Sequence, residues 1–256
     1  KDLEILNKNF NEMIDRLKDQ QDKLIINERH EAWGSLARKL AHEIKNPLTP
    51  IQLTIDRLKN KYSSELTEKN KNEFKENLKI INNQIKQIEK LVNEFSDFAR
   101  MPKPIFQKND LIILMKDNIK LLQELDETIK IDFKNNIKQI LFNSDKEQLS
   151  RVFLNLIKNS IESIQQKTEK VSNFNKIIAI ELNDLDSHIS LIINDNGIGF
   201  KDLNNIKEIL NPYFTTKKQG TGLGLSIVNK IINDHNGNIE FISKDDGAMI
   251  KITFTK

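Results

Sequence analysis

Two glycine-rich strings in the second half of the chain have the residue types of a phosphate- and nucleotide-binding site. Gly220–Leu225 opens a predicted helix, and the unpaired backbone amides at a helix N-terminus bind phosphate. It has neither the Lys-Ser/Thr of a P-loop nor a preceding strand, so it indicates a phosphate loop of another kind. Asp195–Gly199 follows a predicted buried strand. Its glycines let a flat ligand approach the backbone, and Asp195 can accept a hydrogen bond from an exocyclic amine such as that of adenine. An ordinary tight turn is the alternative for either string.

Two asparagines on one predicted helix are candidate ligands of a magnesium ion. Asn155 and Asn159 lie four residues apart and therefore on one face, with Lys158 between them in otherwise apolar surroundings. Amide oxygens can ligate Mg²⁺ while most of its coordination is left to water and phosphate. Two helix asparagines usually bind nothing by themselves, so this interpretation depends on the glycine-rich strings.

His42 lies on a predicted helix and faces away from its apolar stripe. The stripe consists of Leu36, Leu40, Ile44, Leu48, Ile51, Ile55 and Leu58. With Leu40 at 0° and about 100° per residue, His42 lies at about 200° and Asn46 at about 240°, on one outward face. A lone helix histidine is most often a solvated surface residue, which is the alternative here.

The first half of the chain predicts long helices, because glycine and proline are scarce (8 and 5) and most glycines come late. Residues 1–31 have an interrupted heptad spacing that predicts a parallel coiled coil or bundle helix, for which a single surface helix is the alternative. Pro47 predicts a kink in the helix of His42. A second heptad pattern, Phe74–Phe98, predicts a helical hairpin whose apolar stripe is half covered. The two helices of this hairpin are antiparallel, and two copies would bury the stripe in a dimeric four-helix bundle, so we expect a homodimer.

Residues 107–256 alternate between helix and strand patterns after a stiff linker at residues 101–106. This order predicts an α/β sandwich of the α+β class, with helices on one face of a mixed sheet. The predicted helices are Leu111–Leu125, Asp145–Gln166 and Gly222–Asp234, and the predicted strands are Ile129–Phe133, Ile177–Leu182, Ile189–Ile193, Asn238–Ser243 and Ala248–Thr253.

Composition excludes several other classes of protein. The 40 Lys+Arg and 37 Asp+Glu residues give a net charge of +3 and are interleaved, which argues against nucleic acid as a partner. The absence of cysteine excludes disulfides, thiolate metal sites and cysteine nucleophiles, and the four histidines lack the pairing of a zinc enzyme. No run of about 18 apolar residues exists and no signal peptide begins the chain, whose opening in mid-pattern predicts a piece of a longer protein.

Together, five motifs resemble those of the sensor histidine kinases of two-component systems, with a Bergerat-type ATP site. They occur in the family's order over residues ~36–256. They are His42–Thr49 (similar to the H box), Asn155–Asn159 (N box), Asp195–Gly199 (first glycine box), Asn211–Lys217 (F box) and Gly220–Leu225 (second glycine box).

Ala32–Arg38 and Thr49–Leu53 most resemble the transmembrane, NtrY-like nitrogen-regulation kinases, and Phe10–Met13 resembles the closing helix of a HAMP relay. The resemblance implies a coiled-coil signalling helix at residues 1–31, a dimerisation and phosphotransfer domain at residues 32–100 and an ATP-binding domain at residues 107–256. It also implies that the chain is the cytoplasmic portion of a bacterial inner-membrane protein, attached to the membrane only through upstream segments.

The resemblance further implies the reaction and its residues. His42 would accept the γ-phosphoryl group of ATP, Glu43 would take up its proton, and the phosphoryl group would pass to an aspartate in the receiver domain of a response regulator. Asn46 would orient water against the phospho-regulator, Asn159 with Asn155 would hold Mg²⁺, and residues 200–219 would form a lid. The ATP-binding residues would be Asn155, Lys158, Asn159, Asp195, Gly197, Gly199, Phe214, Thr215, Thr216, Lys217, Gly220, Gly222, Leu223, Gly224 and Leu225.

Two alternatives to a kinase can be weighed from the sequence. ATPases of the gyrase and chaperone type are similar in the glycine boxes but have a glutamate as general base for water at the position of Asn155, and an amide cannot take that proton at neutral pH. A degenerate, nucleotide-gated dimeric module without chemistry is the other alternative, and the presence of His42, Glu43 and the glycines argues against it only indirectly.

Overall fold

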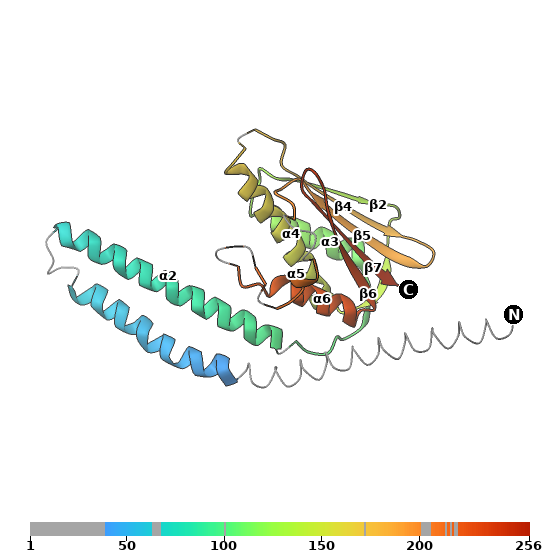
Figure 1. Cartoon of the computed structure of the whole chain (residues 1–256). Helices are drawn as coiled ribbons and strands as arrows, with labels where there is room; N and C mark the ends of the chain where they lie inside the picture. The colour runs from blue at the N-terminus through green and yellow to red at the C-terminus, as the bar shows by residue number, and fades with distance from the viewer. Residues whose placement is uncertain are drawn as a thin grey trace. The chain divides into compact units, whose positions relative to one another are not determined.

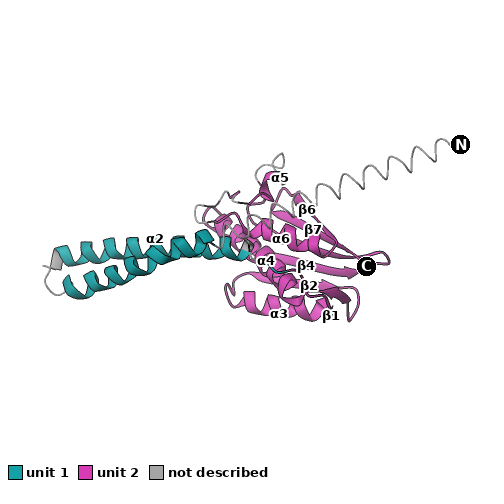
Figure 2. Ribbon diagram, turned by 90° about the horizontal axis from the view of Figure 1, so that it is seen from below, with its two compact units in different colours: residues 1–102 teal, residues 103–256 magenta. Residues whose placement is uncertain are grey.

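The structure, a computed structural model, describes residues 39–62, 68–99, 101–171, 173–200, 206–212, 214–215, 217 and 220–256. The chain divides into two units, residues 1–102 and 103–256, which Figure 2 shows in different colours. The predicted coiled-coil helix at residues 1–31 and the stretch Ala32–Arg38 lie outside the described residues. No helix in the described ranges is long and apolar enough to cross a membrane.

The described part of the first unit is a helical hairpin. A helix over residues 39–62 lies beside α2 (Glu68–Ala99), as Figures 1 and 2 both show. The helix is continuous through Pro47 and Pro50, each of which removes one backbone donor from the helical ladder. The predicted hairpin is confirmed.

The apolar residues of the hairpin divide into a buried and an exposed set. The buried set recurs every seven residues on both helices, which is the spacing of a helix–helix seam: Ala41, Leu48 and Ile55 on the first, Leu78, Ile85 and Val92 on the second. The exposed set belongs to the same predicted stripes and consists of Leu40, Ile44, Ile51, Leu58, Ile81, Ile88 and Leu91, each 38–45% exposed. One hairpin therefore covers only half of its apolar surface, as the sequence predicts.

The second unit is a mixed sheet with helices on one face, which confirms the predicted α+β sandwich. The sheet order is β2-β4-β5-β7-β6; β2 pairs with β4 in parallel, and the other pairs are antiparallel. In Figure 1, α3, α4 and α6 lie together beside this sheet. The elements are β2 (Lys130–Asn135), β4 (Ile177–Asp184), β5 (His188–Asp195), β6 (Gly237–Ser243), β7 (Ala248–Thr255), α3 (Leu111–Gln123), α4 (Lys146–Thr168) and α6 (Gly224–Asp234).

The core of this unit follows from alternation along the strands and from capped helices. Alternate residues of β4 (Ile178, Ile180, Leu182) and of β7 (Ile250, Ile252, Phe254) are buried. Asp145 caps α4 by accepting hydrogen bonds from the amides of Glu147 and Gln148, both at 3.0 Å. The Asp145 amide in turn donates to Nε2 of the buried His235, at 3.0 Å, which ties the start of α4 to the end of α6.

Three short elements were not predicted. β1 (Gln107–Asp110) and β3 (Leu141–Ser144) form a separate antiparallel pair, and α5 (Ile206–Ile209) is a single turn. β1 has no apolar alternation, because its residues are Gln-Lys-Asn-Asp, so periodicity could not reveal it. The bounds of the other elements of this unit differ from the predicted ones by two residues or fewer at each end.

Candidate active site

The predicted nucleotide-binding residues meet on the polar face of α4. Asn155 donates from Nδ2 to the carbonyl of Arg151 at 2.8 Å, which leaves Oδ1 directed away from its own helix. That oxygen lies against the start of α6, since a Cβ added to Gly224 would be 3.1 Å from it. Asn155 therefore lies against the glycine string Gly220–Leu225 rather than in open solvent.

Lys217 joins the segment before α6 to the same face of α4. Its Nζ donates to Oδ1 of Asn159 at 3.0 Å and forms an ion pair with Glu162. Glu162 was not among the predicted site residues, although it lies three residues after Asn159 and thus on the same helix face. The structure brings together two predicted residues, Asn159 and Lys217, and adds a carboxylate to them.

Asp195 ends β5 and is almost completely buried, with 5% of its surface exposed. Its Oδ1 accepts from the amide of Gly197 at 3.0 Å, and its Oδ2 accepts from the hydroxyl of Ser160 at 2.9 Å. Burial raises the pKa of the Asp195 carboxyl above its ordinary value, although both of these hydrogen bonds oppose that shift. A buried carboxylate with unused lone pairs is a strong acceptor for one directed donor.

The turn after Asp195 is packed too tightly for side chains. A Cβ on Gly197 would lie 2.2 Å from Oγ of Ser163, and the Ser163 hydroxyl accepts from the amide of Ile198 at 3.0 Å. Gly199 has a φ of +68° and abuts the carbonyl of Gly247. Gly247, in the β6–β7 hairpin, has a φ of +101°, and a Cβ there would be 1.9 Å from the Asp195 carbonyl oxygen. The hairpin glycine thus buttresses the predicted turn.

The start of α6 has the geometry of an anion-binding helix end. Gly222 has a φ of +70°, which favours glycine, and the buried Leu223 anchors the turn in the core. Leu223 is the N-cap and its side chain makes no capping hydrogen bond, so the first amides of α6 are not satisfied by a side chain at the cap. Gly220 precedes this turn, and Leu225 is half-buried.

For three further predicted site residues of this unit, the structure gives the exposure. Lys158 is exposed on α4, Phe214 is half-buried and Thr215 is exposed. Thr216 and much of the predicted lid at residues 200–219 lie outside the described residues.

The three residues predicted on the hairpin are all exposed. His42, Glu43 and Asn46 lie on the helix over residues 39–62, whereas the neighbouring Ala41 and Leu48 are buried. The Nδ2 of Asn46 and the Nδ1 of His42 are 3.4 Å apart. The predicted outward face, with His42 and Asn46 one turn apart, is therefore present.

Comparison with known proteins identifies the family. Residues 32–104 match the family described as "His Kinase A (phospho-acceptor) domain", and residues 144–256 match "Histidine kinase-, DNA gyrase B-, and HSP90-like ATPase". A sensor histidine kinase NtrY-like protein of Rickettsia prowazekii is 41% identical over 246 residues, 96% of this chain. The chain belongs to the sensor histidine kinases. The nitrogen regulation protein NtrY of Azorhizobium caulinodans is 34% identical over 92% of this chain, so the resemblance to the NtrY-like kinases is confirmed.

This chain spans 40% of the length of the R. prowazekii protein and 30% of that of the A. caulinodans protein. Among solved structures, the catalytic domain of histidine kinase ThkA aligns with a TM-score of 0.53 and 27% identity, covering 59% of this chain and 96% of that one. ThkA in complex with response regulator protein TrrA aligns with a TM-score of 0.62 over 94% of this chain and 67% of that one, at 23% identity. The second likeness shows the fold alone.

The residues of this histidine kinase fit a divalent cation held mainly by its substrate. Within the described ranges no group of three or more His, Cys, Asp or Glu side chains could hold a metal. The Oδ1 of Asn159 nevertheless accepts a hydrogen bond from the ammonium group of Lys217 and is therefore directed at a cation. An amide oxygen at the edge of a phosphate site suits Mg²⁺, which keeps water and phosphate oxygens as its other ligands.

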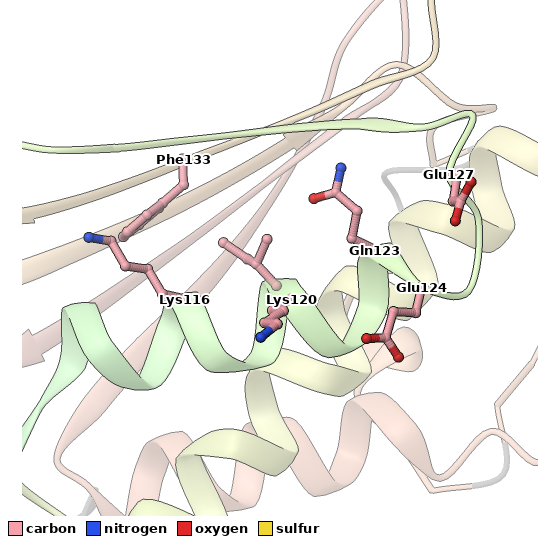
Figure 3. Close-up of a pocket in the computed structure, with 7 residues that line it drawn as sticks. Lys116, Lys120, Gln123, Glu124, Glu127 and Phe133 are labelled. Atoms are coloured by element: carbon pink, nitrogen blue, oxygen red, sulfur yellow. The ribbon is translucent and has the colours of Figure 1, made fainter.

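A groove elsewhere in the ATP-binding unit is not this site. It has a volume of about 550 Å³ and lies along α3 and the loop after it, near β2 (Figure 3). Its charged lining is mixed, with Lys116 and Lys120 opposite in sign to Glu124 and Glu127. None of the predicted nucleotide residues lines it, and it has no cluster of cations for a triphosphate.

Proposed function

We propose that this chain is the catalytic core of an ATP-dependent protein-histidine kinase that phosphorylates His42 and passes the phosphoryl group to an aspartate of a response regulator. The observation that supports it most is the convergence on α4 of three predicted motifs, through Asn155 with Gly224, Asn159 with Lys217, and Ser160 with Asp195. The same chain presents an exposed histidine on a helix face.

The nucleotide would be held at both ends. Asp195 would accept a hydrogen bond from the adenine amine, and the amides of Gly222 and Gly224 at the start of α6 would bind phosphate oxygens. Lys217 and the exposed Lys158 would neutralise phosphate charge. Asn159, with Asn155 in support, would hold Mg²⁺, which when bound supplies charge neutralisation to the phosphates.

Phosphoryl transfer needs in-line positioning and charge neutralisation more than covalent help. A ring nitrogen of His42 would form a bond to the γ-phosphorus as the bond to the ADP oxygen breaks. Glu43 would accept the proton that the imidazole loses. Asn155 makes the competing reaction with water unfavourable, because an amide in the position of a general base cannot take a proton at neutral pH.

The partners and the setting of the reaction belong to the same proposal. The exposed apolar residues of the hairpin would be covered by a second copy in a four-helix bundle. The receiver domain of a response regulator would reach the outward face of His42 and Asn46, where the amide could also orient water for phospho-regulator hydrolysis. The domain bounds we propose are residues 1–31, 32–100, 101–106 and 107–256, in a protein held at the inner membrane through segments outside this chain.

Incubation with γ-labelled ATP tests the proposal. We expect acid-labile, base-stable label on the chain, none on His42→Gln, and transfer of the label to the cognate receiver domain. Label that persists on His42→Gln would overturn the assignment.

A further inference from the structure

Glu162 is a carboxylate inside the nucleotide site to which the proposed function gives no role. It forms an ion pair with Lys217, whose ammonium group also donates to Asn159 Oδ1 at 3.0 Å. The two side chains are only 32% and 35% exposed, so the pair is less screened by solvent than a surface ion pair. A partly buried pair of this kind fixes the position of a long, flexible lysine side chain.

The backbone of Lys217 makes two hydrogen bonds to described residues. The Lys217 amide donates to Oγ1 of Thr215 at 3.1 Å, and the Gly220 amide donates to the Lys217 carbonyl at 3.2 Å. Gly220 packs against Thr215 so closely that a Cβ would be 2.4 Å from the threonine Oγ1. The Lys217 side chain therefore links Thr215 and Gly220 to α4, and Gly220 is the first residue of the glycine string Gly220–Leu225.

Sharing the amide oxygen of Asn159 between two cations is electrostatically unfavourable. A magnesium ion bound to it would lie about 2.1 Å away, and an ammonium nitrogen that stayed at 3.0 Å would then repel the ion at short range. When Asn159 ligates Mg²⁺, its hydrogen bond with Lys217 is therefore weakened. Glu162 is the partner that remains.

We propose that Glu162 is a positioning residue that holds the Lys217 ammonium group at the phosphate end of the site. The inference rests on the proposed function, since it assigns Lys217 to the nucleotide phosphates.

A double-mutant cycle on Glu162→Gln, Lys217→Met and the double variant tests this. Glutamine keeps the size of glutamate and removes its charge. The matched control is Glu169→Gln, the same change at the exposed C-cap of the same helix. The first readout is hydrogen exchange of the Lys217 and Gly220 amides by NMR, and the second is the kcat and KM of autophosphorylation.

We expect both single variants to raise the hydrogen-exchange rates of the amides at positions 217 and 220 by at least ~5-fold. The exchange rates along α4, and those of Glu169→Gln, should stay as in wild type. Glu162→Gln should lower kcat ~10-fold with KM for ATP changed less than ~3-fold, because the adenine end is untouched. The double variant should be no slower than Lys217→Met. Unchanged exchange in Glu162→Gln, or losses that multiply in the double variant, would overturn the proposal.

Failure of this inference and failure of the proposed function give different results. If the chain is not a kinase, wild type acquires no phosphohistidine, whereas the exchange experiment still reports whether Glu162 holds Lys217. If only the positioning role is wrong, wild type still forms phosphohistidine, and Glu162→Gln either phosphorylates as well as wild type or has a loss that multiplies with that of Lys217→Met.

Discussion

The two parts of the proposed reaction are built in opposite ways. His42 and Asn46 lie four residues apart on one continuous helix, so helical geometry alone gives them a common face. The proposed ATP site instead joins α4, the turn after β5, the segment before α6 and the β6–β7 hairpin. A face on one helix depends little on the rest of the fold, whereas an assembled site couples ligand binding to domain stability.

The largest effect should come from the exposed apolar residues of the hairpin, because a second copy of the chain is needed to cover them. Ile51→Glu places a charge in the exposed stripe, so each dimer would bury two unpaired carboxylates and dissociate ~1,000-fold more readily, or about 4 kcal/mol. Leu53→Glu is the matched control, because Leu53 is also exposed but lies on the side of His42 by helical geometry. Light scattering across a concentration series measures both, and equal dissociation by the two variants would mean that the stripe is not the interface.

The assembled site should be sensitive to a single methyl group far from it in sequence. Gly247→Ala places a Cβ against the Asp195 carbonyl at a φ of +101°, and strain and overpacking together should cost roughly 3 kcal/mol of unfolding free energy. Asp245→Ala, in the same hairpin but exposed, should change it by less than ~0.5 kcal/mol. Urea unfolding compares them, and an unaffected Gly247→Ala would show that the hairpin does not buttress the turn.

Asp195→Asn should separate binding from stability within the same site. Losing a charge-assisted hydrogen bond to adenine should weaken ATP binding roughly 10–150-fold, about 1.5–3 kcal/mol. The raised pKa of Asp195 means that the folded protein binds this proton more tightly than the unfolded chain does. The carboxyl's contribution to stability is therefore full below its ordinary pKa of 3.8 and is lost as pH rises through the folded value.

At neutral pH the ionised Asp195 therefore lowers stability, and the asparagine variant should unfold at no lower urea concentration than wild type. Calorimetric titration with ATP and urea unfolding at pH 7 measure the two effects. Weaker binding accompanied by equal destabilisation would mean that Asp195 is structural.

The smallest effect should come from Asn46, which lies on a helix face formed without residues from any other element. Asn46→Ala should slow dephosphorylation of the phospho-regulator ~10-fold, about 1.4 kcal/mol of transition-state stabilisation, because its amide would no longer orient the water. Autophosphorylation should stay within a few-fold, whereas Glu43→Ala should damage it most. Both rates are measured on both variants, and equal loss of the two reactions in Asn46→Ala would assign the residue to helix integrity.

The same contrast separates what the sequence could predict from what it could not. The outward face of His42, the helical hairpin and the residue ranges of the five strands in the large sheet followed from periodicity. The division of the apolar stripe did not: Ala41 is in the hairpin core whereas Leu40 and Ile44 are exposed, because the register between two helices is set by packing rather than by either helix.

In the ATP-binding unit the motifs marked Asn159, Asp195 and Lys217, but not the residues that hold them. Ser160 and Glu162 have no signal beyond their helix position, and Gly247 was indistinguishable from an ordinary hairpin glycine until the fold brought it to Asp195. The polar β1 was missed because its pairing with β3 depends on backbone hydrogen bonds rather than on an apolar pattern.

The most direct test of the central claim is to map the phosphoryl group after incubation with Mg²⁺ and ATP, by tandem mass spectrometry at alkaline pH. The account predicts one phosphohistidine, at His42. It should be unchanged in the control Glu169→Gln and, at ATP concentrations below the dissociation constant, strongly reduced in Asp195→Asn. Phosphate on another residue, or steady release of free phosphate without any phosphorylated chain, would contradict the account.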